Sequence, residues 1–194
     1  MLALARELGV ACAMLAWTRE RIAIMLESNL PGNVSPALAR FADVLCMYEL
    51  DLFSQQLKCV LAGPPSPLEE RAIMFRLAEH AVHVCAVELL EAQDRKADAA
   101  SLRCLAPITD QATARAAKLA ADALESKSIG HARGAAHFAA CDADDTGAPG
   151  RAAEHAAYAV AQTAGCYNDP EHARRVYDAA INLLTVLHVG VPQA

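Results

Sequence analysis

The chain has 194 residues, of which 55% are hydrophobic and 21% are charged, and its mean hydropathy is +0.19. This length allows one compact domain that buries roughly 70% of the surface of its unfolded chain, and the composition excludes disorder as the main state. The formal charge is −6, from 17 basic and 23 acidic residues, and basic residues cluster only in pairs such as Arg95-Lys96 and Arg174-Arg175. Nucleic acid is therefore not an expected partner, because phosphate-tracking surfaces need clustered Lys and Arg.

Alanine dominates the second half of the chain. The sequence holds 44 alanines, 28 of them after residue 97, whereas aromatic residues make up only 5%. Alanine has the highest intrinsic helix propensity, and its small side chain lets helices approach closely. No alternating strand pattern and no Asn-Gly hairpin signal occurs. The sequence therefore predicts an all-α fold, in which residues 1–194 form a single-domain helical bundle of about six to eight helices without a β-sheet.

The apolar N-terminal residues 1–17 do not read as a targeting or membrane segment. No basic residue precedes this run, Arg6 and Glu7 interrupt it, and Glu20 and Arg21 follow too soon for a span of about 20 residues. No longer uncharged apolar run occurs elsewhere in the sequence. We therefore expect no membrane partner and a cytoplasmic location.

The seven cysteines are dispersed and show no C-x-x-C spacing. An odd, scattered set without a signal peptide is typical of reduced thiols in cytosolic proteins. Several cysteines fall on apolar helical faces, where a free thiol behaves as a small hydrophobe. The seven are Cys12, Cys46, Cys59, Cys85, Cys104, Cys141 and Cys166.

Proline and glycine divide the first half into three predicted helices. The first covers residues 1–28 and ends before the Asn-Leu-Pro-Gly-Asn run at 29–33. Ser35 as N-cap and Pro36 at the first helical position begin the second, which runs to about residue 62. Its apolar stripe comprises Leu38, Phe41, Leu45, Tyr48, Leu52 and Cys59.

A capping-box pattern marks the third predicted helix. Ser66 and Glu69 have the required spacing, and Pro67 occupies the first position, so we expect a helix from Pro67 to about Gln93. At 100° per residue, most polar side chains gather on one face, but Ile73 and Val87 interrupt it. A second packing surface is therefore predicted there, which would make this helix central.

Five further helices are predicted in the second half. Pro107 ends the first, Thr109 is the expected cap of the second, Asp169 with Pro170 begins the last, and Gly165 and Gly190 are expected stops. The predicted segments are 98–105, a long alanine-rich segment after Thr109 that residues 126–130 weaken as a helix, 131–141, 151–164 and 170–189.

The polar face of the third helix carries candidate metal ligands. Glu79 and His83 are four residues apart and His80 and His83 three apart, within reach of one metal ion. The paired Glu-x-x-His motifs of di-iron proteins and the His-Glu-x-x-His motif of metalloproteases are absent. The alternative is a solvated face in which Arg76 and these residues pair. The candidate ligands are thus Glu79, His80 and His83, and no motif indicates an organic cofactor.

The acidic segment Asp142-Ala143-Asp144-Asp145-Thr146-Gly147 has two partial motif matches. It fits the start of an EF-hand loop and the D-x-D-x-T motif of haloacid-dehalogenase-type phosphatases. The calcium loop needs a carboxylate at position 12, which is Ala153 here. The phosphatase motif needs an apolar strand before Asp142, yet residues 134–141 are predicted to be helical. A polar loop between helices is therefore the expectation.

Dispersed histidines could meet a cysteine in space and form a nucleophilic pair. They are His131, His137, His155, His172 and His188. The sequence does not bring them together, and P-loop, G-x-S-x-G and G-x-G-x-x-G motifs are missing. We expect His172 in the solvated first turn of its helix, and we predict no catalytic residue.

Residues 130–139 read Gly-His-Ala-Arg-Gly-Ala-Ala-His-Phe-Ala. This segment resembles a His-Ala-x-Gly-Ala-Ala signature in a family of alanine-rich, all-helical immunity proteins of bacterial toxin systems. The resemblance covers about 10 to 30 residues, and the N-terminal half and the segment after Gly150 depart from the family. It implies a binding role and assigns no role to any residue.

Two classes of function follow. The preferred hypothesis is a non-catalytic helical interaction or regulatory protein that presents helix faces to a protein partner. The alternative is a small-molecule or metal-binding helical protein, enzymatic or not, with a pocket between helices that uses His80, His83 and a thiol. Surplus apolar residues on the first helix further predict a homo-oligomer with Trp17 near the contact, unless that helix is simply central.

Overall fold

The structure is a computed structural model that describes residues 35–46 and 68–189. Helices account for most of these residues, and no strand occurs in the two ranges, so the all-α prediction is confirmed. The elements are α2 (Pro36–Cys46), α4 (Glu70–His80), the π-helical segment η1 (Ala81–Ala86), α5 (Val87–Glu91), α6 (Lys96–Arg103), α7 (Gln111–Ala123), α8 (Gly130–Ala139), α9 (Ala148–Ala164) and α10 (Pro170–Val189). The predicted first helix with Trp17 lies outside the described residues, as does the end of the second.

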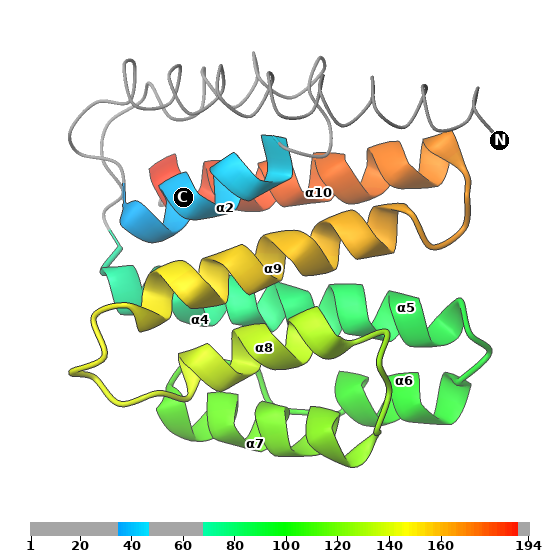
Figure 1. The fold of residues 1–194 in the computed structure, drawn as a ribbon, viewed down its shortest axis with the longest axis horizontal. Helices are drawn as coiled ribbons and strands as arrows, with labels where there is room; N and C mark the ends of the chain where they lie inside the picture. Colours follow the sequence, from blue (N-terminus) through cyan, green and yellow to red (C-terminus); the bar gives the residue numbers. More distant parts are fainter. Residues whose placement is uncertain (1–34, 47–67, 190–194) are drawn as a thin grey trace, which may run out of the picture.

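The helices lie side by side in two layers (Figure 1). In the view of Figure 1, α2, α9 and α8 are in front, α10 and α4 to α5 lie behind them, and α6 and α7 are at the lower edge. Helix α9 packs against α2, α8, α4, η1 and α10, so it is the central element of this arrangement. The sequence predicted that the third helix would be central, and that helix shares the position with α9.

Small side chains make this close packing possible. Most of the buried residues of α9 are alanines, all four buried residues of α8 are alanines, and the two helices pack against each other. Larger apolar side chains, including Phe41, Met74 and Leu90, fill the space between the layers. Ile73 and Val87 are both buried, which confirms the predicted second packing surface of the third helix.

The third predicted helix begins later than its capping-box pattern indicated. Helix α4 starts at Glu70, and Glu69 occupies the N-cap position without a side-chain hydrogen bond to the helix. The carboxylate of Glu70 instead accepts hydrogen bonds from the Ser35 hydroxyl and the Ala37 N–H at the start of α2, both at 2.5 Å. A contact between distant segments thus places the first turn, because a carboxylate is stabilised at a helix N-terminus.

The other helix ends follow local capping chemistry. Helix α7 is capped by Asp110 rather than Thr109: the Thr113 N–H donates to Asp110 Oδ1 at 2.8 Å, and the Asp110 N–H donates to the Thr113 hydroxyl at 3.1 Å. Helix α9 begins at Ala148, three residues before the predicted start, because Pro149 is tolerated in a first turn. Gly165 ends α9 as predicted.

Candidate functional site

The helix that runs from Glu70 to Glu91 contains a π-helical turn. Segments α4, η1 and α5 follow one another without a break, and the residues at both junctions keep right-handed helical dihedral angles. The π-helical segment is Ala81–Ala86. Such turns are rare, occur mostly as single insertions in α-helices and are frequent at functional sites. The surface around this turn is therefore a candidate functional site.

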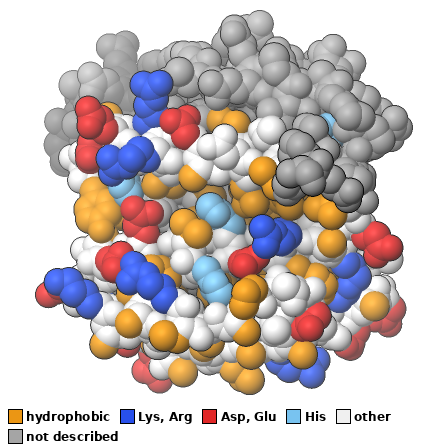
Figure 2. Space-filling view, turned by 180° about the vertical axis from the view of Figure 1, so that it is seen from behind, with side chains coloured by type: hydrophobic (Ala, Val, Ile, Leu, Met, Phe, Trp, Pro, Cys, Tyr) orange, Lys and Arg blue, Asp and Glu red, His pale blue; other side chains and the backbone are white. Residues whose placement is uncertain are grey.

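A cavity lies between this turn and α10. Its volume is about 110 Å³, and it is partly open to solvent. Its walls come from α4, η1, α5, α9 and α10: His80, Val84, Cys85, Glu88, Thr163, His172, Arg175, Val176 and Ala179. Figure 2 shows the molecule from behind, on the side where α10 and α4 to α5 lie, with histidines among apolar and charged side chains in the middle of the face. Polar groups from three helices thus converge on one small apolar hollow.

His172 is a deeply buried polar side chain of this cavity. Only 3% of the residue is exposed, so the prediction of a solvated first turn is wrong. Its Nδ1 lies 3.4 Å from a carboxylate oxygen of Glu88, and its Nε2 lies 3.0 Å from the carbonyl of Thr163. The Tyr167 ring packs edge-on against it at 4.7 Å between centroids. These neighbours cover the first turn of α10 and fix the orientation of the imidazole.

The structure places one cysteine next to one of the dispersed histidines, which is the arrangement that a nucleophilic pair requires. Cys166 Sγ lies 3.7 Å from His172 Nε2. That nitrogen is closer to the Thr163 carbonyl, to which it can only donate, so it is not free to accept the thiol proton. Burial, together with the charge of Glu88, raises the pKa of the Cys166 thiol, whereas a nucleophilic cysteine needs a lowered pKa. The contact therefore holds His172 in place and does not activate the sulfur.

His80 and Arg175 supply side-chain polar groups that are not paired with another residue in the described part of the chain. Burial lowers the pKa of His80 to about 4, so the ring is neutral at pH 7 and offers one N–H donor and one acceptor nitrogen. Arg175 makes no ion pair with another described residue, whereas the neighbouring Arg174 pairs with Asp178 at 3.9 Å. The cavity thus has a guanidinium without a carboxylate partner in the described part of the chain.

Cys85 and Thr163 form the floor between η1 and α9. Burial raises the pKa of the Cys85 thiol to about 12, so it is a neutral wall of the cavity. The Thr163 hydroxyl donates to the Ala159 carbonyl at 2.8 Å and reaches the Cys85 carbonyl at 3.4 Å. The sequence predicted a pocket with His80, His83 and an unspecified thiol, of which His80 and the Cys85 thiol line the cavity and His83 does not. Glu88, Thr163 and Arg175 were missed because nothing local marks them.

The three candidate metal ligands have separate roles. Glu79 forms an ion pair with Arg76 at 2.8 Å, and His80 lines the cavity. His83 is half-buried, its Nε2 has no hydrogen-bond partner in the described structure, and burial lowers its pKa against the opposing charge of Glu79. Within residues 35–46 and 68–189, no group of three or more His, Cys, Asp or Glu side chains is placed to hold a metal ion.

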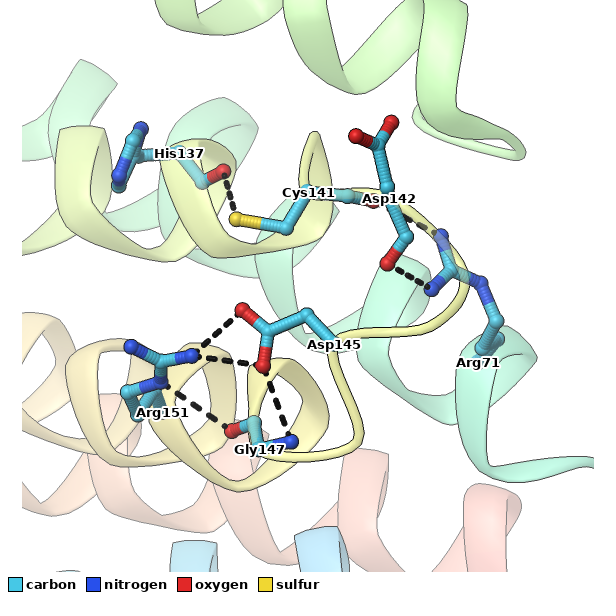
Figure 3. Close-up of polar contacts among 7 residues, drawn as sticks. All are labelled: Arg71, His137, Cys141, Asp142, Asp145, Gly147 and Arg151. Atoms are coloured by element: carbon cyan, nitrogen blue, oxygen red, sulfur yellow. Dashed lines mark hydrogen bonds and ion pairs between the residues drawn. The ribbon is translucent and has the colours of Figure 1, made fainter.

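The acidic loop before α9 is held by hydrogen bonds from arginines of α4 and α9 (Figure 3). The Asp145 carboxylate accepts from the Arg151 guanidinium at 2.5 and 2.8 Å and from the Gly147 N–H at 3.1 Å. Arg71 of α4 donates to the carbonyls of Cys141 and Asp142 at 3.1 and 3.2 Å. Helix α8, not a strand, precedes the loop, so the phosphatase motif lacks its required context. The loop acts as a connector between α8 and α9.

Searches against protein-family models, curated proteins and solved structures found no match. No helix among the described residues is long and apolar enough to cross a membrane. The described cysteines, Cys85, Cys104, Cys141 and Cys166, are free thiols. The geometry of the cavity is therefore the basis for a functional proposal.

Proposed function

We propose that this protein is a non-catalytic helical binding protein that takes a small molecule with an anionic group, such as a carboxylate, in the cavity between η1 and α10. The observation that carries the proposal is the convergence of neutral His80 and Arg175, which has no ion-pair partner among the described residues, on an apolar hollow beside a π-helical turn. This is the pocket hypothesis of the sequence analysis, with binding in place of metal coordination.

The cavity wall matches this ligand chemistry. A guanidinium binds a carboxylate with two parallel hydrogen bonds, and Arg175 has no such partner in the described structure. The His80 ring supplies a further hydrogen-bond donor. Val84, Val176 and Ala179 provide apolar surface for the rest of the ligand. A volume of about 110 Å³ that is partly open to solvent favours a small ligand of the size of propionate or benzoate.

Binding is favoured over catalysis by the state of the thiols. Both cysteines near the cavity, Cys85 and Cys166, have raised pKa values, chiefly because they are buried. His172 is engaged at both nitrogens by Glu88 and the Thr163 carbonyl. No activated nucleophile with a free base stands at this cavity, so the polar groups serve to orient a ligand.

Thermal unfolding with matched ligand pairs tests the proposal. A series of small carboxylates and their neutral amides, such as propionate with propionamide and benzoate with benzamide, is added at millimolar concentrations. Carboxylates are expected to raise Tm with concentration, as mass action requires for a ligand of the folded state, and amides are not. Arg175→Ala should abolish the rise, and Arg174→Ala, which removes the adjacent surface guanidinium, should preserve it. Equal responses to acid and amide, or equal loss in both variants, would contradict the proposal.

Two exposed apolar side chains beside the cavity favour a protein partner as the second candidate. Val84 is 45% exposed and Tyr167 47% exposed, and Tyr167 packs on His172. Aromatic residues next to a pocket are typical anchors of protein interfaces, and an immunity-type protein would bind its toxin in this way. Selection of peptides from a random library on the immobilised protein tests this. Acidic peptides that lose affinity in Val84→Ser and Tyr167→Ser support a protein partner, whereas no enrichment counts against it.

A further inference from the structure

A pair of histidines lies between α8 and α9, apart from the residues that line the cavity. His131 is in the first turn of α8, His155 is in α9, and their Nδ1 atoms are 3.4 Å apart. The His155 ring stacks on Phe138 with centroids 5.3 Å apart, and the His131 ring lies 5.0 Å from Tyr158. Aromatic neighbours thus hold each imidazole against the other.

Gly134 makes room for this pair. A Cβ atom at position 134 would lie 2.5 Å from His155 Nδ1 and 2.8 Å from two further ring atoms, closer than real Cβ contacts. The His155 ring therefore occupies the space that any other residue at position 134 would fill. The close approach of the two rings is thus part of the packing between α8 and α9 and not a chance contact of long surface side chains.

The separation of the two nitrogens fits a tetrahedral metal ion. Zinc binds imidazole at roughly 2.0–2.1 Å, so two nitrogens on the edge of a tetrahedron lie about 3.3–3.4 Å apart. Burial lowers the pKa of both rings, and His131 lowers that of His155 further, so both are neutral at pH 7, the form that binds metal. No carboxylate is bonded to either ring among the described contacts.

We propose that His131 and His155 bind a zinc ion through their Nδ1 atoms, with water or a group from a ligand in the remaining positions. This site is separate from the cavity of the proposed function and does not depend on it. Sequence spacing gave no signal for it, because the two residues are 24 positions apart on different helices. Because structural zinc sites have four protein ligands and catalytic sites three, a site with two is expected to bind zinc more weakly and reversibly.

The proton balance distinguishes this site from thiol sites on the same chain. In the free protein one ring must donate its Nδ1–H to the other. On metal binding that ring moves its proton to Nε2, so both Nδ1 lone pairs point to the ion and no net proton is released near pH 7.5. Zinc bound by a cysteine, in contrast, releases the thiol proton.

Calorimetric titration of the reduced, metal-free protein with Zn²⁺ at pH 7.5 tests the proposal. We expect one saturable event whose heat does not depend on the ionisation enthalpy of the buffer, because no proton is released. His131→Gln and His155→Gln should each weaken binding by at least about tenfold, since each removes one of two ligands. Substitution with Co²⁺ should give absorption of a nitrogen and oxygen site without a thiolate charge-transfer band.

His137→Gln is the matched control, because His137 is on the same helix, is exposed and is not part of the pair. It should leave the zinc affinity within about twofold of the original. Circular dichroism verifies that each variant is folded, and if one is not, the other variant of the pair gives the result. Absence of saturable binding, buffer-dependent heat from proton release, or equal loss in His137→Gln would overturn the proposal.

Discussion

At the scale of single residues, the α8–α9 interface depends on the absence of a side chain at Gly134. Alanine in place of a mid-helix glycine ordinarily stabilises by up to about 1 kcal/mol through helix propensity. Here the added Cβ would clash with the His155 ring at 2.5 Å. Overpacking of this kind costs about 1–3 kcal/mol, so it outweighs the gain.

We therefore expect Gly134→Ala to lower the free energy of unfolding by about 1–2 kcal/mol, measured by denaturant titration. Gly150→Ala is the control, because nothing lies within 4 Å of a Cβ built there in α9. It should be neutral or slightly stabilising. If both variants gain stability alike, the close approach of His155 to α8 is incorrect.

His188 is a second residue whose burial has an energetic consequence. It is 0% exposed in α10, and neither ring nitrogen has a hydrogen-bond partner in the described structure. A buried polar group without a partner costs about 1–3 kcal/mol, so His188→Leu should raise the free energy of unfolding by a similar amount. Denaturant midpoints compare it with His137→Leu at an exposed position, where little change is expected. A marked loss of stability in His188→Leu would show that the ring nitrogens have hydrogen-bond partners.

At the scale of elements, the sequence predicted the identity of most described helices but not all of their ends. Pro36, Pro170 and Gly165 mark helix ends by local backbone chemistry, and the structure keeps them. The start of α4 was misplaced because Glu70 bonds to α2, a contact between residues 33 to 35 positions apart that no local pattern reveals. Long-range hydrogen bonds thus decide where a helix begins when the local sequence favours several start positions about equally.

The π-helical turn explains why the candidate site was only partly predicted. A wheel drawn at 100° per residue assumes uniform α-helix, but η1 is more widely wound and rotates everything after Ala81 relative to α4. The wheel therefore grouped His83 with His80 on one polar face, whereas His80 lines the cavity and His83 does not. Arg175 and Thr163 come from helices far along the chain, and only tertiary packing brings them to His80.

The cap of α7 gives a prediction at this scale. Hydrogen bonds from Thr113 lower the pKa of the Asp110 carboxyl below its ordinary value of 3.8. Because the folded-state pKa is lowered, the cap stabilises the protein above pH 3.8, and this contribution is lost as the pH falls through the folded-state pKa. Asp110→Ala should thus lower Tm at pH 7, and the difference from the parent should shrink in strong acid. Asp144→Ala, in the loop before α9, serves as control and should lower Tm less at pH 7.

At the scale of the whole molecule, the burial of several histidines makes the stability of the fold depend on pH. Burial lowers the pKa of His80 to about 4 and lowers those of His83, His131 and His155 as well. Between pH 6.5 and about 4 the unfolded chain binds protons at these positions and the folded protein does not, so stability falls as the pH is lowered.

We expect the free energy of unfolding to fall across this window, with His80 contributing at most about 3 kcal/mol. His80→Gln should flatten the pH dependence, whereas His137→Gln should leave it unchanged. Denaturant titrations at half-unit pH steps give the curve. A stability that is level, or that rises from pH 6.5 to 4, would contradict the burial of these rings.

The central claim is that the hollow between η1 and α10 is a binding site for a small anion. Amide chemical-shift mapping of the labelled protein with benzoate, against benzamide at the same concentration, tests it most directly. Benzoate should cause saturable shifts that concentrate at the cavity wall, around His80, Thr163 and Ala179, and these shifts should be lost in Arg175→Ala. Shifts that are absent at saturating benzoate, or that concentrate on α7 and α8 away from the cavity, would contradict it.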